Sequence, residues 1–231
     1  MIKIKEYINQ SAIGIMVILT YFLLPYIKYI VVYFLNGATI STNLSIILSI
    51  LIEILTIAVI LLLFNKRIKK DFIDLKKNHK QYFSKYFKYY LIGLAVMYIS
   101  NAILIFGFQG GLSGNEEGIR NLLGIHPIYV YISAVLLAPS VEELVFRGGI
   151  RNIIPNDILF ILVSGLVFGG MHLLGNVSNL MDLLYIIPYS SLGIAFAYIY
   201  SKTDNIFVTM LLHTMHNGIL VAIQIAVLLF G

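Results

Sequence analysis

The sequence predicts an all-α fold: a polytopic membrane helix bundle with about seven transmembrane helices. Of its 231 residues, 59% are hydrophobic and only 12% are charged, and the mean hydropathy is +0.91. Soluble domains average about 45–50% apolar and about 25% charged residues. This composition excludes a soluble domain as well as the disordered and fibrous classes.

The apolar stretches have the length of roughly 20 residues that a spanning helix needs. We expect spans at residues 11–35, 44–64, 89–108, 127–150, 158–174, 181–200 and 206–230. Pro25 and Lys28 interrupt the first stretch, and the fifth is short. The first stretch does not end in a small-residue cleavage site. We therefore expect it to be a retained helix rather than a signal peptide.

Basic residues set the expected orientation in the cell membrane. Nine of the 16 Lys and Arg residues lie between Lys66 and Lys88, so the positive-inside rule places the loop 65–88 and the N-terminus in the cytoplasm. Alternation then puts the linker 36–43 and the Gly-rich loop 109–126 outside. The segment 66–88 is either an amphipathic helix on the membrane surface or, in our preferred interpretation, a basic loop that only fixes topology.

The basic excess is thus a topology signal, and we expect the lipid bilayer rather than nucleic acid as a partner. The chain has no cysteine. This excludes disulfide bonds, a thiol nucleophile and any metal site with cysteine ligands.

Costly polar groups gather in about the last 100 residues of the chain. An ionisable side chain at the centre of a membrane helix costs about 2.5–3.5 kcal/mol and by default marks function. The apolar segments here contain three such groups of residues: Glu142-Glu143-Leu-Val-Phe-Arg147, Phe168-Gly-Gly-Met-His172 and His213-Thr-Met-His216-Asn217.

Helical spacing sorts these side chains. Glu143 and Arg147 are four residues apart and can pair, whereas Glu142 points about 100° away and stays free. His213 and Asn217 share a face by the same spacing. The sequence leaves the role of His216 open, between the same groove and a neighbouring helix.

Together these groups are sufficient for hydrolysis. Glu142 could take a proton from water and return it to a leaving amine, and His172 could orient that water. His213 and Asn217 could stabilise the oxyanion. In the alternative, Glu142, His172 and His213 hold a zinc ion with one position open for water, although the sequence lacks His-Glu-x-x-His.

Each group also has a purely structural interpretation. The pair of Glu143 and Arg147 could only orient helices, a lone buried His172 or His213 is commonly a hydrogen-bonded core residue, and Asn217 could tie two helices together. Their occurrence together in consecutive apolar segments favours a functional site.

At these residues the chain resembles the CPBP family of intramembrane proteases, which includes type II CAAX prenyl endopeptidases and bacteriocin-immunity (Abi) proteins. The family pattern is Glu-Glu-x-x-x-Arg, Phe-x-x-x-His and His-x-x-x-Asn, and all three motifs occur here in order. The resemblance covers roughly residues 127–225. We therefore expect a catalytic helix bundle over 127–231, preceded by variable transmembrane helices over 1–126.

The resemblance implies a bacterial intramembrane endopeptidase that cleaves a membrane-associated peptide or lipidated protein. Glu142 would activate water with the help of His172, His213 and Asn217 would stabilise the oxyanion, and Glu143 and Arg147 would support them. The family carries a metalloprotease label, yet this mechanism runs on glutamate, so we expect no required cofactor and keep zinc as the alternative. Peptide-signal maturation and self-immunity to a bacteriocin are the roles that the resemblance suggests.

Two other functions remain open from the sequence. The first is a non-catalytic membrane immunity or adaptor protein in which the motif residues are scaffold. The second is a small proton-coupled transporter that uses Glu53, Asp182 and the Glu/His set as a proton path. More simply, Glu53 marks a helix interface and Asp182 the first turn of a helix.

Overall fold

A computed structural model describes residues 2–34, 41–108 and 110–230, and within these ranges the chain is helical with no strand. Six of the described helices are long and apolar enough to cross a membrane. The segment expected as a span at 158–174 forms a shorter apolar helix, Asp157–Met171. The predicted class, a polytopic helical membrane bundle, is confirmed.

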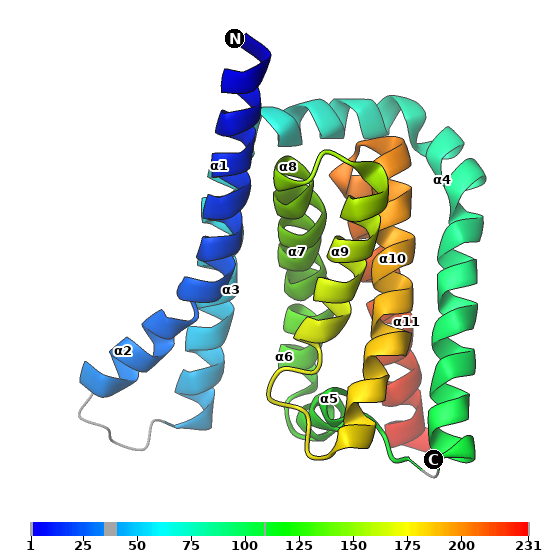
Figure 1. Ribbon diagram of the computed structural model, residues 1–231. Helices are drawn as coiled ribbons and strands as arrows, with labels where there is room; N and C mark the ends of the chain where they lie inside the picture. The colour runs from blue at the N-terminus through cyan, green and yellow to red at the C-terminus, as the bar shows by residue number, and fades with distance from the viewer. Residues whose placement is uncertain (1, 35–40, 109, 231) are drawn as a thin grey trace.

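The first expected span is two helices. α1 (Ile2–Leu23) ends before Pro25, and α2 (Tyr26–Phe34) leads away from the bundle (Figure 1). Proline has no backbone N–H to continue the helical hydrogen bonds, which accounts for the break. α3 (Thr42–Leu63) follows. Residue 35 of that span and most of the linker expected outside, residues 36–40, lie beyond the described ranges.

The basic segment is a helix, so the predicted loop at 65–88 is wrong; the helix of the alternative interpretation is present, and its place on the membrane surface stays a prediction. α4 (Asn65–Ala102) continues through a π-helical turn, η1 (Ile103–Gly107). No Gly or Pro interrupts it before Gly93, and the charge run alone does not break a helix. Its first part crosses one end of the bundle, and its last part descends along the side (Figure 1).

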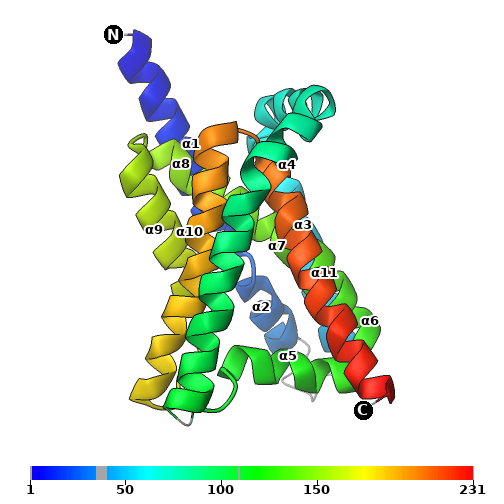
Figure 2. The same cartoon turned by 90° about the vertical axis from the view of Figure 1, so that its right-hand side faces the viewer.

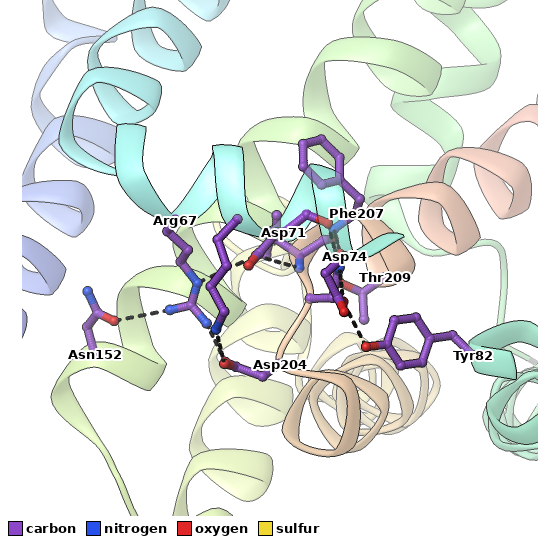
Figure 3. A network of polar contacts seen from close by, with 11 residues as sticks. Arg67, Asp71, Asp74, Tyr82, Asn152, Asp204, Phe207 and Thr209 are labelled. Carbon is purple, nitrogen blue, oxygen red and sulfur yellow. Dashed lines mark hydrogen bonds and ion pairs between the residues drawn. The ribbon is translucent and has the colours of Figure 1, made fainter. Parts of the chain in front are cut away.

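Two acidic residues anchor the first part of α4 to the start of α11 (Ile206–Phe230). The Asp71 carboxylate accepts the Ile206 N–H at 3.1 Å, and the Asn205 amide donates to the Asp71 carbonyl at 2.7 Å and to Asp74 at 2.8 Å (Figure 3). Tyr82 also donates to Asp74, at 2.7 Å. Both acids of the basic segment are therefore hydrogen-bonded at the start of α11, where the helix dipole is positive.

The loop expected at 109–126 contains a helix, α5 (Gly114–Ile125). Ser113 caps it, because its Oγ accepts the Glu116 N–H at 3.3 Å. This is half of the Ser-x-x-Glu capping pattern, which the charge-based interpretation of the segment overlooked. α5 lies across the end of the bundle opposite the basic part of α4 (Figure 2).

The helix that carries the first motif is continuous from Pro127 to Ile153 and alternates between α- and π-helical turns. Its parts are α6 (Pro127–Val130), η2 (Tyr131–Leu137), α7 (Ala138–Glu142), η3 (Glu143–Gly149) and α8 (Ile150–Ile153). π-helical turns inside helices are frequent at functional sites. Here one of them, η3, runs from Glu143 through Arg147.

Glycines bring α9 (Asp157–Met171) and α10 (Ile186–Thr203) into close contact. A Cβ at Gly165 would lie 2.4 Å from Ile194, and a Cβ at Gly169 would lie 2.7 Å from the Ser190 backbone nitrogen. Two small residues four apart allow this close approach. The 3₁₀ helix η4 (Leu180–Tyr185) precedes α10.

Successive loops lie at opposite ends of the bundle, as the expected alternation requires. Tyr7 donates to the Ile153 carbonyl at 3.0 Å, and Arg67 pairs with Asp204 at 2.6 Å, so the start of α1, the basic part of α4 and the turns after α8 and α10 share one end. The C-terminus and α5 lie at the other end (Figures 1 and 2). Which end faces the cytoplasm stays a prediction from the positive charge.

The expected boundary between residues 1–126 and 127–231 does not separate two cores. Tyr90 and Met97 of α4 pack with Phe196 of α10 and Leu212 of α11 in one buried cluster. Helices from both parts of the chain therefore support the same site. The boundary itself stays a prediction.

Candidate active site

The three motifs meet inside the bundle. The helix Pro127–Ile153 supplies Glu142, Glu143 and Arg147, the end of α9 supplies His172, and α11 supplies His213 and Asn217. Glu143 and Arg147 are both fully buried, and Arg147 Nε lies 3.1 Å from Glu143 Oε2. The predicted ion pair is confirmed.

His213 lies between the two glutamates. Its Nδ1 is 3.0 Å from Glu143 Oε1, and its Nε2 is 3.8 Å from Glu142 Oε2. Glu143, ionised against Arg147, can only accept, so His213 Nδ1 carries the hydrogen. Nε2 is then the nitrogen left to exchange protons, and it donates a hydrogen bond only when the ring is doubly protonated.

Glu142 is the more exposed of the two carboxylates. Its side chain is 18% exposed, whereas that of Glu143 is 0% exposed. The spacing argument, in which one glutamate is neutralised locally and the other stays free, therefore agrees with the structure.

The Arg147 side chain is enclosed by aromatic rings as well as by Glu143. Its guanidinium carbon lies 4.7 Å from the centre of the Phe168 ring and 5.6 Å from that of Phe196. A cation over a ring face is attracted by the ring quadrupole. Phe168 of the second motif thus holds the arginine of the first.

His172 is fixed by the same phenylalanine. Its Nδ1 lies 2.9 Å from the Phe168 carbonyl oxygen, one helical turn earlier. A carbonyl only accepts, so Nδ1 carries the hydrogen and Nε2 has a free lone pair. His172 in this tautomer is a hydrogen-bond acceptor and a base.

Two further polar residues of α11, Asn217 and His216, also contact neighbouring helices. Asn217 Nδ2 donates to the Ala134 carbonyl at 2.7 Å, which leaves its second N–H for another acceptor. His216 Nδ1 lies 3.3 Å from the Tyr90 hydroxyl of α4. His216 thus packs on a neighbouring helix and also lines the cavity described next.

A cavity of about 330 Å³ adjoins these residues, and most of its lining is apolar or aromatic. Its polar lining includes His172, His213, His216, Asn217 and Tyr189. Glu142 is not part of the lining, and its Oε2 lies 3.8 Å from His213 Nε2. Three of the four predicted catalytic side chains therefore share one cavity, and the fourth lies beside one of them.

The zinc alternative required Glu142, His172 and His213 to converge. Within the described residues, no three His, Asp or Glu side chains are grouped so that they could hold a metal ion. The Nδ1 atoms of both histidines are engaged by Glu143 and by the Phe168 carbonyl, a pattern that metal-ligating histidines also show, and both Nε2 atoms stay available. The described side chains are thus not grouped as a three-ligand site, and the expectation that no cofactor is required stays a prediction.

The two acids invoked for a proton path have local partners. Glu53 accepts hydrogen bonds from Ser133 at 2.9 and 3.0 Å, which ties α3 to η2. Asp182 accepts the backbone N–H groups of Ser178 and Asn179 at 2.7 and 3.1 Å and completes the cap of η4. Their simpler interpretations, a helix interface and a first-turn acid, agree with these contacts.

Sequence reasoning missed Tyr189 and Ser113. Tyr189 stacks on His172, with ring centres 4.5 Å apart and planes 20° apart, and its hydroxyl lies 2.6 Å from Ser113 Oγ. The capping pattern at Ser113 was available as a signal. Nothing in the sequence around Tyr189 distinguishes it from the other tyrosines.

Comparison with known proteins identifies this part of the chain. Residues 124–219 match the sequence model of the family described as type II CAAX prenyl endopeptidase Rce1-like. All three motifs fall within that segment. This region, less than half of the chain, is similar to the Rce1-like family. The resemblance inferred from the motifs is thereby confirmed.

Curated relatives of the Rce1-like region come from several bacteria. The chain is 25% identical to the Bacillus subtilis protein named "Putative membrane peptidase YdiL", over 58% of each chain. It is 28% identical to the "Membrane-embedded CAAX protease MroQ" of Staphylococcus aureus, over 58% of this chain and 57% of MroQ. An uncharacterized protein of Mycoplasma capricolum is 32% identical over 50% of this chain and 35% of its own length.

The chain thus spans little more than half of YdiL and MroQ. No solved structure matches it.

Proposed function

We propose that the protein is an intramembrane endopeptidase that hydrolyses a peptide bond in a membrane-associated peptide or lipidated protein. The observation that carries the proposal is the meeting of His172, His213 and Asn217 at one cavity between apolar helices, with Glu142 Oε2 3.8 Å from His213 Nε2. The Rce1-like family and the printed names of YdiL and MroQ support the same reaction class.

Glu142 is the proposed base. Its Oε2 lies 3.8 Å from His213 Nε2, so the proposed base lies beside a proposed oxyanion donor. A water molecule gives its proton to Glu142 as its oxygen attacks the peptide carbonyl, and His172, with its free Nε2, orients the water. The proton then passes to the leaving amine, so one water yields one new acid and one new amine.

Developing negative charge on the carbonyl oxygen needs hydrogen-bond donors. Asn217 has one N–H beyond its bond to Ala134, and His213 supplies a second donor when its ring is doubly protonated next to Glu142 and Glu143. Preorganised donors of this kind stabilise an oxyanion without reorganisation. Glu143 and Arg147 keep His213 and Phe168 in place.

The proposed chemistry requires no bound metal. If it is correct, chelators leave cleavage unchanged. Loss of activity with a chelator and its recovery with zinc would instead support the alternative ligand set.

The test uses purified protein in lipid nanodiscs with candidate membrane peptides encoded near its gene, and mass spectrometry of the products. We expect cleavage by the natural chain and by Glu117→Gln, a control at an exposed acid of α5, and none by Glu142→Gln. Candidates for maturation of a peptide signal and for bacteriocin immunity form separate sets of the peptide panel.

The same variants separate catalysis from a scaffold role. A folded Glu142→Gln protein that keeps full biological activity would contradict the peptidase proposal and support a non-catalytic adaptor. Substrate uptake into proteoliposomes that is lost in Glu53→Gln would support the transporter.

A further inference from the structure

Tyr189 stacks on the ring of His172. The His172 ring contacts two aromatic rings: that of Phe168, with ring centres 4.8 Å apart and planes at 54°, and that of Tyr189, with centres 4.5 Å apart and planes at 20°. The Phe168 carbonyl fixes only the Nδ1 atom. The rotation of a histidine ring about its last side-chain bond is otherwise weakly restricted.

Tyr189 is itself anchored through its hydroxyl. That oxygen lies 2.6 Å from Ser113 Oγ and accepts from Asn115 Nδ2 at 3.4 Å. Ser113 is the residue that caps α5, through its bond to the Glu116 N–H. A continuous set of contacts therefore runs from the start of α5, outside the Rce1-like segment, to the ring of His172.

The close contact of α9 and α10 sets the distance at which the two rings meet. Gly169 on α9 allows the backbone of Ser190 to approach, and this places Tyr189, the preceding residue of α10, opposite His172. The stacked pair therefore depends on the backbone as well as on the two side chains.

We propose that Tyr189 is a positioning residue for His172. Stacking on Tyr189 sets the ring plane, the Phe168 carbonyl sets the tautomer, and together they leave Nε2 of His172 free at the cavity. The Ser113 cap of α5 keeps Tyr189 in place. The catalytic part of this inference rests on the proposed function, whereas the structural part does not.

Histidine NMR tests the structural part without any substrate. The chain has five histidines, so selective ¹⁵N-histidine labelling gives few signals, and the signal that His172→Gln removes is that of His172. In the natural chain we expect one tautomer, protonated at Nδ1. Tyr189→Leu should convert it to a mixture of tautomers, because a ring free to rotate loses the bond from Nδ1 to the Phe168 carbonyl. Tyr189→Phe, which keeps the ring but loses the bond to Ser113, should have an intermediate effect.

Tyr198→Leu is the matched control. Tyr198 lies on the same helix, is also half-buried and also packs on a neighbouring aromatic ring, that of Tyr89, with ring centres 4.6 Å apart. The Tyr198→Leu substitution should leave the His172 signal unchanged. An unchanged His172 tautomer in a folded Tyr189→Leu protein would overturn the proposal.

The catalytic part is measured on a peptide that the natural chain cleaves. Tyr189→Leu should lower kcat by about tenfold to 10²-fold with little change in KM, as expected when a catalytic group is slightly misplaced. Tyr189→Phe should retain more activity, and Tyr198→Leu should match the natural chain. An unchanged kcat in Tyr189→Leu would overturn the catalytic role of Tyr189.

The NMR measurement and the kinetic measurement test the two parts of the inference independently. If the natural chain cleaves no peptide while Tyr189→Leu still alters the His172 tautomer, the proposed function is wrong and the positioning of His172 by Tyr189 stands.

Discussion

Glu143 is the residue on which the buried charge of the site depends. One of its oxygens pairs with Arg147 and the other accepts from His213, and it has no exposed surface. Removing one partner of a buried ion pair leaves the other charge unpaired in a low-dielectric interior. Glu143 therefore stabilises the fold, and Glu142, which is partly exposed, is free for chemistry.

Substitution separates these two roles. Glu143→Gln should lower the free energy of unfolding by about 3–5 kcal/mol, because Arg147 becomes an unpaired buried cation. Glu142→Gln should change stability far less while abolishing cleavage. Thermal unfolding followed by circular dichroism in one detergent checks both, and equal stability of the two variants would contradict this assignment.

Asn217 provides a kinetic prediction at the same scale. If its free N–H stabilises the oxyanion, Asn217→Ala should lower kcat by about 10²–10³-fold. Steady-state kinetics on a cleaved peptide measures this. An effect confined to KM would instead show that Asn217 binds substrate.

Sequence spacing predicts contacts within one helix and not those between helices. Glu143 and Arg147 pair because four residues bring them to one face. The bond between Glu143 and His213 joins residues 70 positions apart, and the stacking of Tyr189 on His172 depends on how closely α9 and α10 approach. Neither distance is encoded in a local pattern, so the residue types of the site and its contact within one helix could be predicted, whereas its contacts between helices could not.

At the scale of the elements, the contact between α9 and α10 requires glycine at one position and not at its neighbour. A Cβ at Gly169 would lie 2.1 Å from Ser190 Oγ and 2.7 Å from its backbone nitrogen, whereas a Cβ at Gly170 would meet nothing within 4 Å.

Gly169→Ala should therefore destabilise the protein by about 1–3 kcal/mol, the usual cost of overpacking. Gly170→Ala, the same change in open space, should leave the melting temperature unchanged or slightly higher. Equal melting temperatures for the two variants would contradict the close approach of the helices.

The basic part of α4 shows why element type was harder to predict than element position. Its charge pattern is compatible with a loop or a helix, since lysine tolerates both. The deciding contacts are those of Asp71 and Asp74 with the start of α11, far along the chain. Those acids appear in the sequence only as minor offsets to the lysines.

At the scale of the whole molecule, the positive charge predicts which end of the bundle faces the cytoplasm. The natural chain has no cysteine, so single-cysteine variants report accessibility directly. Ser84→Cys lies on the basic part of α4 and Ser178→Cys in the turn before η4, both exposed and at opposite ends. A membrane-impermeant maleimide should label Ser178→Cys in intact cells and Ser84→Cys only after permeabilisation, and the reverse pattern would contradict the predicted orientation.

The shared use of Glu143 also has an evolutionary consequence. Because one carboxylate serves Arg147 and His213, a single substitution at any of the three leaves a buried group without its partner. A lineage that abandons catalysis cannot discard these residues one at a time without passing through an unstable intermediate. Inactive descendants of such a protein would therefore retain Glu143 and Arg147 long after Glu142 had changed.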